Sequence, residues 1–295
     1  MRILVTGRNG QVGHELAKLA EQSQHEWLCL DRAGLDVTSQ ADVDRVIDDF
    51  KPNIVINATA YTAVDKAETE RELATAVNEH GPHFLALACE RNQAALLHIS
   101  TDYVFSGDAT TPYTETDIVG PTGHYGASKL AGEKAIAKHC SKHIILRTAW
   151  VFGAHGNNFV KTMIRVAQGR DTLGVVADQH GAPTSAEGIA KTLLTIAEQI
   201  EHGNTAWGIY HYSGTPYTTW FAFAEAIFIE AEKRHLLPHT VTVNAITTAD
   251  YPTPAKRPEN SRLDCSKIKH IFAIEADDWL NQLNKVLNES TRVES

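Results

Sequence analysis

Short apolar runs alternate with stretches of helical periodicity along the first half of this 295-residue chain. Residues 2–6 (RILVT) have the length and composition of a buried strand, and Val12, Leu16 and Leu19 then recur at helical spacing. Similar strand patterns occupy residues 27–30, 54–56, 95–99 and 144–146, with weaker ones at 175–176 and 209–212. Strands that alternate with helices predict a parallel sheet covered by helices on both faces.

Two helical stretches separate the later strands. The first spans about 69–91, and Pro82 inside it predicts a kink or a break because proline lacks a backbone N–H. The second spans about 128–139. After Trp150 the alternation loosens, and the prolines within residues 249–264 exclude a regular helix or a central strand there.

The overall composition narrows the classes of function. Hydrophobic residues make up 43% of the chain and charged residues 21%, as in ordinary globular proteins. The net charge of −9, with Lys and Arg dispersed, argues against a nucleic-acid-binding surface. No apolar run reaches the length of a membrane span, and MRILVTG enters the first strand with no signal peptide ahead of it. We therefore expect a cytoplasmic protein that binds neither nucleic acid nor membrane.

Cysteine and histidine give no sign of a redox or metal centre. The four cysteines are scattered and form no CxxC pair, so we interpret them as reduced core residues. The histidines include no HExxH, and His80 and His83, which could share a helix face, have no evident third ligand. The residues themselves thus predict no metal site.

The pattern G-x-x-G-x-x-G occurs twice, in different contexts. The first copy, Gly7, Gly10 and Gly13, follows the strand ILVT and opens a helix. Backbone N–H groups and the positive helix end can meet a pyrophosphate there, so this copy predicts a dinucleotide site rather than a bare tight turn. The second copy, residues 120–126, follows a polar run and contains Pro121, and we interpret it as a loop.

Asp31 and Arg32 bear on which dinucleotide binds. Asp31 ends the second strand, eighteen residues after Gly13, where a carboxylate can accept hydrogen bonds from both ribose hydroxyls of adenosine. Arg32 could instead hold a 2′-phosphate. NADH and NADPH therefore both stay open, and so does a simple capping role for Asp31.

Tyr125 and Lys129 form the most informative pair. They are four residues apart in YGASK, which places both side chains on one face of a helix. A nearby ammonium group favours the phenolate and lowers the pKa of the tyrosine, so that Tyr125 can give a proton to a carbonyl oxygen during hydride transfer. Lys129 can also donate hydrogen bonds to the nicotinamide ribose. Thr101, at the end of the fourth strand, can hydrogen-bond the same carbonyl oxygen, although a strand-end cap alone explains it.

Together these motifs resemble those of the extended short-chain dehydrogenase/reductase family. The resemblance covers nearly the whole chain and rests on TGRNGQVG, NATAYTAVDKAE, VNEHG, ISTDYVFSG, YGASK and RTAWVFG. With the strand pattern it predicts an α/β fold, a Rossmann-type doubly wound parallel sheet with a smaller α/β substrate-binding lobe. We expect the NAD(P)-binding domain at 1–150, with later strand and helix contributions from about 173–212, and the lobe at 151–172 and 213–295.

The resemblance implies a role for each matching position. The catalytic set would be Thr101, Tyr125 and Lys129, the last two also contacting the cofactor. The other cofactor-binding residues would be Gly7, Gly10, Gln11, Val12, Gly13, Asp31, Arg32, Asp36, Val37, Ala58, Ala60, Tyr61 and Thr62. The substrate-binding residues would be Val64, Thr101, Asp102, Tyr103, Trp150 and Arg257. Trp150 could equally be a core aromatic, and Arg257 a solvated charge beside Lys256.

The reaction that the resemblance implies is reduction of the 4-keto group of dTDP-4-dehydro-L-rhamnose by NADPH or NADH, giving dTDP-L-rhamnose. Nucleotide-sugar dehydratases of the family carry Thr-Asp-Glu where this chain has Thr101-Asp102-Tyr103, and the missing glutamate is their proton-transfer group. Simple carbonyl reduction is therefore favoured. Two alternatives stay open: reduction of another nucleotide-linked keto-sugar, and an NADP-binding regulatory subunit resembling that of methionine adenosyltransferase.

Some members of the family form dimers bridged by Mg²⁺ through acidic residues. Glu15 and Glu187 match such positions, and two solvated helix carboxylates explain them equally well. The expected partners are thus a nucleotide sugar and, by resemblance, a second copy of the chain. Asn9 stands where the family often has a small residue, and we expect neither Asn9 nor Pro82 to touch the reactive centre.

Overall fold

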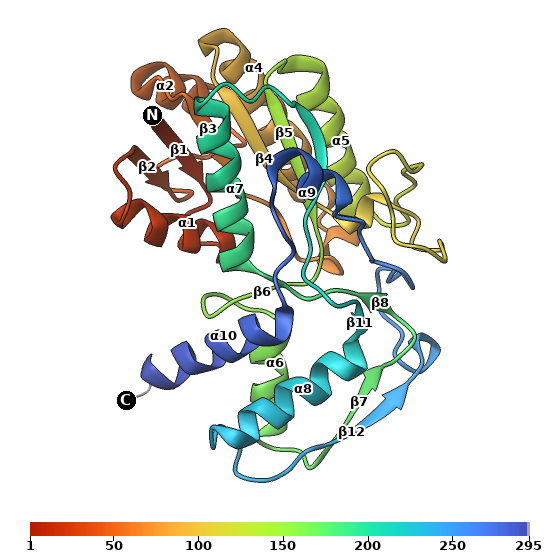
Figure 1. Ribbon diagram of the computed structural model, residues 1–295. Coiled ribbons are helices and arrows are strands. Elements are labelled where there is room, and N and C mark those ends of the chain that lie inside the picture. Colours follow the sequence, from red (N-terminus) through yellow and green to blue (C-terminus); the bar gives the residue numbers. More distant parts are fainter. Residues whose placement is uncertain (294–295) are drawn as a thin grey trace.

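The computed structural model describes residues 1–293, built around a six-stranded sheet in the order β10-β5-β4-β3-β1-β2 (Figure 1). Each neighbouring pair in this sheet is parallel. Its strands are β1 (Arg2–Thr6), β2 (Glu26–Leu30), β3 (Ile54–Asn57), β4 (Ala95–Thr101), β5 (His143–Thr148) and β10 (Gly208–His211). The predicted doubly wound α/β fold is confirmed.

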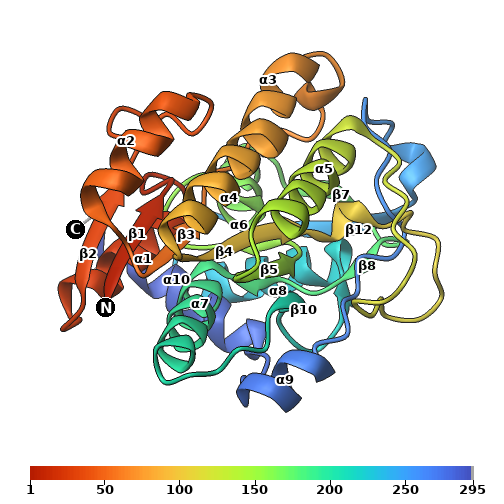
Figure 2. The ribbon, with the colours of Figure 1, turned by 90° about the horizontal axis from the view of Figure 1, so that it is seen from above.

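Helices cover both faces of the sheet (Figure 2). On one face lie α2 (Gln40–Phe50), α4 (Gly81–Asn92) and α5 (His124–His139), and on the other lie α1 (Gln11–Glu21), α7 (Ala186–Glu201) and α9 (Ser266–Phe272). Strand β1 shows the reason: Ile3 and Val5 pack with α1 and α7, whereas Leu4 packs with α2 and α4. Because both faces are buried, these strands are unbroken apolar runs in the sequence.

The predicted helix at 69–91 is interrupted, as expected. It consists of α3 (Arg71–Thr75), a π-helical turn (Ala76–His80) and α4, with Pro82 in the first turn of α4. The backbone stays helical from Thr75 through Gly81, so Pro82 lies inside a continuous helical run, next to the π turn, and lacks the N–H that a regular α-helix would bond there.

The helix that carries Tyr125 begins earlier than predicted. Because α5 starts at His124, Gly126 of the second glycine triplet lies in a helix, and its assignment to a loop is wrong. A Cβ at Gly126 would lie 2.1 Å from the carbonyl oxygen of Tyr103. This glycine therefore allows α5 to pack closely against the 3-10 turn η3 (Asp102–Val104).

The remaining chain forms a smaller α/β lobe (Figure 1). It contains α6 (Phe159–Ala167), β7 (Thr172–Val176), α8 (Trp220–Lys233), β12 (Thr242–Ile246) and α10 (Trp279–Val293). Its separate hydrophobic core includes Phe152, Phe223 and Leu283. Short segments complete the fold: β6 (Val151–Phe152), β8 (His180–Gly181), β9 (Thr184–Ser185), β11 (Thr218–Thr219), and the 3-10 turns Lys66–Glu68 and Thr248–Asp250.

Two elements differ from the expected division of the chain. Contrary to the expected contribution from about residue 173, β7 pairs with β12 in the lobe, whereas α7 and β10 do belong to the sheet domain. Conversely, α9 lies in the stretch assigned to the lobe but packs on the sheet through Ile268 and Phe272. Among residues 1–293, no helix is long and apolar enough to cross a membrane.

Candidate active site

Two cavities meet at the glycine turn, near the carboxyl ends of β1, β3, β4 and β5. We call them the Tyr125 cavity, of about 530 Å³, and the Asp31 cavity, of about 320 Å³. Both are lined by Asn9, Gly10, Thr59 and Ala60, so they form one continuous groove.

The structure brings nearly all the sequence-predicted residues to this groove. In the Tyr125 cavity lie Gly10, Gln11, Val12, Ala58, Ala60, Thr62, Val64, Thr101, Asp102, Tyr103, Tyr125, Lys129 and Trp150. In the Asp31 cavity lie Gly7, Gly10, Asp31, Arg32, Asp36, Val37, Ala60 and Tyr61. The two exceptions, Gly13 and Arg257, line neither cavity. Gly13 packs against the backbone of Gly7, and Arg257 hydrogen-bonds Tyr103, so each contacts a residue of the groove wall.

The glycine turn is shaped to receive phosphate groups. A Cβ at Gly13 would lie 2.0 Å from the carbonyl oxygen of Gly7, and Gly7 itself has a φ of +77°. Gly10 caps α1 without a side-chain hydrogen bond, so the first N–H groups of this helix keep no intrahelical partner. This bare, positively polarised helix end fits the pyrophosphate of a dinucleotide.

Asn9, which was not predicted as a site residue, lies in the groove. It lines both cavities, and its amide donates a hydrogen bond to Oδ2 of Asp31 at 3.1 Å. Oδ1 of Asp31 accepts from the backbone N–H groups of Ala33 at 3.0 Å and Gly34 at 3.2 Å. The bond from Gly34 is the main cause that holds the pKa of Asp31 below its ordinary value. Asp31 is therefore a turn cap and also an acceptor at the cavity wall.

Tyr125 lies between a hydroxyl group and a second tyrosine. It hydrogen-bonds Thr101, and its ring centroid lies 5.4 Å from that of Tyr103 with the planes at 75°. Burial raises the pKa of Tyr125, and the hydrogen bond with Thr101 offsets only part of this rise. The expected lowering of this pKa by Lys129 is not seen, and the charges that act on the phenol, those of Asp102 and Tyr103, raise its pKa further. The phenol keeps its proton, as a proton donor must.

Lys129 is enclosed, with 2% of its surface exposed. Its Nζ donates to the carbonyl oxygen of Ile99 at 2.6 Å and lies 3.3 Å from Nε2 of His98. Burial lowers the pKa of Lys129 to about 8, although Glu133 acts in the opposite direction.

Of the two roles considered for Thr101, the structure shows the cap. The hydroxyl of Thr101 accepts from the N–H of Tyr103 at 3.2 Å, which caps η3, and donates to Oδ1 of Asp102 at 3.0 Å. Asp102 is 4% exposed, and burial raises the pKa of its carboxyl to about 6 despite hydrogen bonds from Ser261 and Thr101.

Arg257 supports the site through its neighbours. Its guanidinium donates to Asp65 at 2.5 Å and hydrogen-bonds Tyr103, so it is a paired charge rather than a solvated one. Burial raises the pKa of Tyr103 to about 12. The phenol of Tyr103 is therefore neutral near neutral pH and cannot act as the carboxylate of a dehydratase does.

Several residues of the groove were not predicted. Thr59, Ser100 and Thr148 line the Tyr125 cavity at or just beyond the ends of β3, β4 and β5, so the strand-end rule that identified Thr101 could have found them. Gly156 and Asn157 also line it, from a loop after β6 that carries no such signal.

Glu15 and Glu187 are neutralised by lysines rather than gathered around a metal. Glu15 pairs with Lys18 at 3.1 Å, and Glu187 pairs with Lys191 and lies 4.0 Å from Lys285. Among the described residues, no three His, Cys, Asp or Glu side chains form a group that could hold a metal ion. The structure thus gives no support for Mg²⁺.

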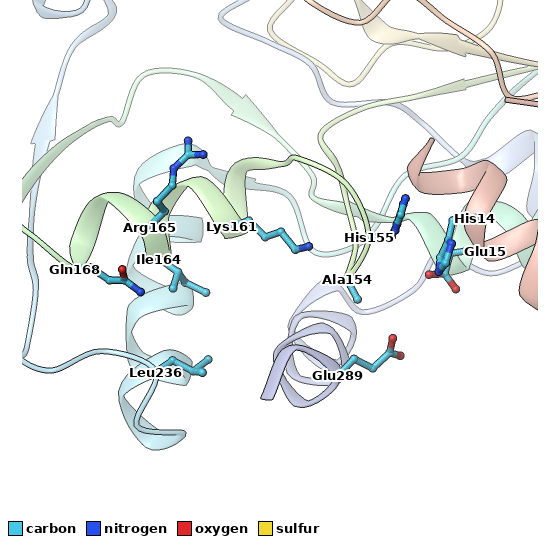
Figure 3. A pocket seen from close by; sticks show the side chains of 10 residues that line it. All are labelled: His14, Glu15, Ala154, His155, Lys161, Ile164, Arg165, Gln168, Leu236 and Glu289. Carbon is cyan, nitrogen blue, oxygen red and sulfur yellow. The ribbon is translucent and has the colours of Figure 1, made fainter. Parts of the chain in front are cut away.

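A further cavity of about 600 Å³ lies beside α1 and α6 (Figure 3). The rings of His14 and His155 stack there with centroids 4.1 Å apart, and the side chain of Lys161 extends from α6 toward His155. Its lining includes no tyrosine, serine or threonine hydroxyl. It therefore offers no proton-donating hydroxyl for carbonyl chemistry, and the groove is the candidate active site.

Comparisons with known proteins agree with this geometry. The family described as RmlD substrate binding domain matches residues 1–292. Over 287 residues the chain is 51% identical to the dTDP-4-dehydrorhamnose reductase of Aggregatibacter actinomycetemcomitans, which covers 97% of this chain and 98% of that protein. The crystal structure of a dTDP-4-dehydrorhamnose reductase from Clostridium acetobutylicum has a TM-score of 0.92 and 37% identity, covering 99% of this chain and 100% of that one. The reductase of Bacillus anthracis, solved in complex with NADP, has a TM-score of 0.87 and 36% identity, covering 98% and 99%.

Proposed function

The chain belongs to the family of the RmlD substrate binding domain, and on that premise we propose that it is an NAD(P)H-dependent oxidoreductase that reduces the 4-keto group of dTDP-4-dehydro-L-rhamnose. The observation that carries the proposal is the continuous groove. It has the glycine turn at its middle, Asp31 and Arg32 at one end, and the Thr101, Tyr125 and Lys129 set at the other. The product would be dTDP-L-rhamnose.

In this proposal each part of the groove has a separate task. A bound nicotinamide supplies the hydride for the carbonyl carbon. Tyr125 holds a proton on its phenol oxygen and donates it to the carbonyl oxygen, while the hydroxyl of Thr101 orients the phenol through their hydrogen bond. Lys129 offers an N–H to the cofactor ribose. Residues 1–150 with α7 and β10 would bind the cofactor, and the lobe would complete the sugar site.

Both nicotinamide cofactors fit the residues present. Asp31 provides a carboxylate for ribose hydroxyls, as NADH requires, and Arg32, whose side chain is 79% exposed, provides a cation for the 2′-phosphate of NADPH. The relative from Bacillus anthracis was solved with NADP, which favours NADPH for this chain.

The two alternatives are weaker for specific reasons. A regulatory subunit has no need for a buried tyrosine, lysine and threonine set, and full-length relatives are named as reductases. Reduction of a different nucleotide-linked keto-sugar would use the same catalytic set with another pocket shape. This alternative therefore differs from the main proposal only in the identity of the substrate.

A spectrophotometric assay tests the proposal. The purified chain is mixed with dTDP-4-dehydro-L-rhamnose or a uridine-linked 4-keto-sugar, with NADPH or NADH, and the loss of nicotinamide absorbance is followed. We expect rapid oxidation with the thymidine-linked sugar. No oxidation with any keto-sugar, together with co-purification of a methionine adenosyltransferase, would establish the regulatory alternative.

A further inference from the structure

A row of polar side chains crosses the sheet behind the Tyr125 cavity. The strand register aligns Thr6 of β1 with Asn57 of β3, and Asn57 with His98 of β4. Thr6 Oγ1 donates to Asn57 Oδ1 at 2.8 Å, and Asn57 Nδ2 lies 3.0 Å from His98 Nδ1. The row ends at Lys129, whose Nζ lies 3.3 Å from His98 Nε2. His98 is 0% exposed and Asn57 1%, so water cannot replace a mismatched partner.

One backbone N–H sets the direction of every hydrogen bond in this row. The N–H of Thr59 can only donate, and it contacts Oδ1 of Asn57 at 3.1 Å. Nδ2 of Asn57 therefore faces His98 and donates to Nδ1. A neutral imidazole carries a single N–H, so that of His98 lies on Nε2, directed at Lys129.

Only an uncharged amine can accept this N–H, because an ammonium group has no lone pair. We propose that His98, oriented by Asn57, is a positioning residue that stabilises the amine form of Lys129 and so sets the pH at which this lysine becomes charged. The carbonyl oxygen of Ile99 takes one of the two amine N–H groups, which leaves the other for a ligand in the cavity.

The other groups around Lys129 act in both directions. Glu133, one turn further along α5, favours the ammonium form, but its carboxylate is paired with Arg147 of β5 at 2.6 Å. Asp102 lines the same cavity and is an anion above about pH 6, while burial keeps the two tyrosines of the cavity neutral. Burial of Lys129 opposes its charge, and its pKa is lowered to about 8.

The charge of Lys129 also controls turnover, a consequence that rests on the proposed function. In the reduction, the ammonium form of Lys129 stabilises the phenolate left on Tyr125. Turnover should therefore fall as the pH rises through the midpoint of Lys129. A change that reverses the hydrogen-bond direction at His98 should move this alkaline limb to higher pH.

The direct test uses the whole protein without nicotinamide or sugar, so its outcome does not depend on the proposed reaction. The lysine side chains are labelled with ¹³C at Cε, the Lys129 resonance is identified by its absence in Lys129→Met, and its pH midpoint is measured. We expect this midpoint more than one pH unit below the ordinary lysine value of about 10.4. In ¹⁵N spectra, Nδ1 of His98 should carry no proton and Nε2 should carry one.

The variant Asn57→Asp should reverse the direction of the hydrogen bonds from residue 57 through His98 to Lys129. A carboxylate can only accept, so Nδ1 of His98 takes the proton and Nε2 becomes an acceptor for the ammonium group. The midpoint of Lys129 should rise by roughly one pH unit or more, with the His98 tautomer exchanged. Three results would overturn the proposal: a proton on Nδ1 in the unaltered protein, an ordinary Lys129 midpoint, or a tautomer exchange that leaves this midpoint unchanged. The first two do not depend on Asn57→Asp, and they decide the matter if that variant does not fold.

Discussion

The indole rings of Trp150 and Trp220 stack with their centroids 3.7 Å apart and their planes 15° from parallel. Trp150 lines the Tyr125 cavity with a φ of +49°, a strained value for a bulky residue. Trp220 is the first residue of α8 in the lobe. The lobe therefore fixes the position of Trp150, an aromatic residue of the cavity wall that follows β5 of the sheet domain.

Replacing Trp220 tests this support. We expect Trp220→Leu to raise KM for the keto-sugar roughly three- to tenfold, because a stacked aromatic pair contributes about 0.5–1.5 kcal/mol. NADPH affinity, measured by fluorescence titration, should stay unchanged. In Trp220→Phe, which keeps an aromatic ring, KM for the keto-sugar should stay close to that of the unaltered protein. An unaltered KM in Trp220→Leu would show that Trp150 keeps its position without the stack.

Removing the phenol of Tyr125 tests the proton donor. Tyr125→Phe should lower kcat by about 10²–10⁴-fold, the usual contribution of a positioned acid, while Kd for NADPH stays within about twofold. The matched control is Tyr251→Phe, since Tyr251 is 62% exposed and lies outside the groove. Steady-state kinetics that leave Tyr125→Phe within tenfold of the unaltered protein would refute the assignment.

Arg32 should distinguish the two nicotinamide cofactors. Its guanidinium lies 3.7 Å from Asp36 in an exposed ion pair, which leaves it available to a 2′-phosphate. We expect Arg32→Ala to weaken NADPH binding by about 10- to 100-fold, since a hydrogen bond to a charged group contributes about 1.5–3 kcal/mol. NADH binding should change by less than about twofold. Equal losses for both cofactors in calorimetric titrations would rule out a 2′-phosphate contact.

The glycine turn tolerates no side chain at Gly13. Because a Cβ there would lie 2.0 Å from the Gly7 carbonyl oxygen, Gly13→Ala must shift the backbone that we propose to bind the phosphates. Cofactor binding should fall at least tenfold, with a lower Tm. At Gly169 a Cβ meets nothing within 4 Å, so Gly169→Ala is the control. Its cofactor affinity and its Tm should both stay unchanged. Normal NADPH binding by Gly13→Ala would contradict the phosphate role.

Asp102 should make stability depend on pH. Burial raises the pKa of its carboxyl from 3.8 to about 6, so the folded protein binds more protons than the unfolded chain between these values. The destabilisation by this group is therefore complete above about pH 6 and is relieved as the pH falls toward 4. Asp102→Asn should raise the free energy of unfolding at pH 7 by about 1–3 kcal/mol, and this gain should shrink near pH 4. Urea unfolding of both proteins between pH 4 and pH 7 measures this difference in the free energy of unfolding. A variant less stable than the parent at pH 7 would mean that the charged form is stabilised.

Local spacing made much of the site predictable. The glycine turn after β1 and the Tyr125–Lys129 pair follow from strand and helix periods, which decide which residues share a turn or a face. The start of α5 was missed because its first N–H, that of His124, is capped by Glu68 at 2.7 Å. That carboxylate lies 56 residues earlier in the chain, so no residue close to His124 in the sequence predicts this cap.

The sequence by itself determined the parallel α/β order, the glycine turn and the residues of the proposed reactive set, because each depends on neighbours along the chain. Only the tertiary structure decided how those groups are charged. Spacing places an ammonium one turn from Tyr125, but folding removes water from both side chains and sets His98 against Lys129. Burial consequently raises the pKa of Tyr125 and lowers that of Lys129, since the cost of an enclosed charge depends on everything packed around it.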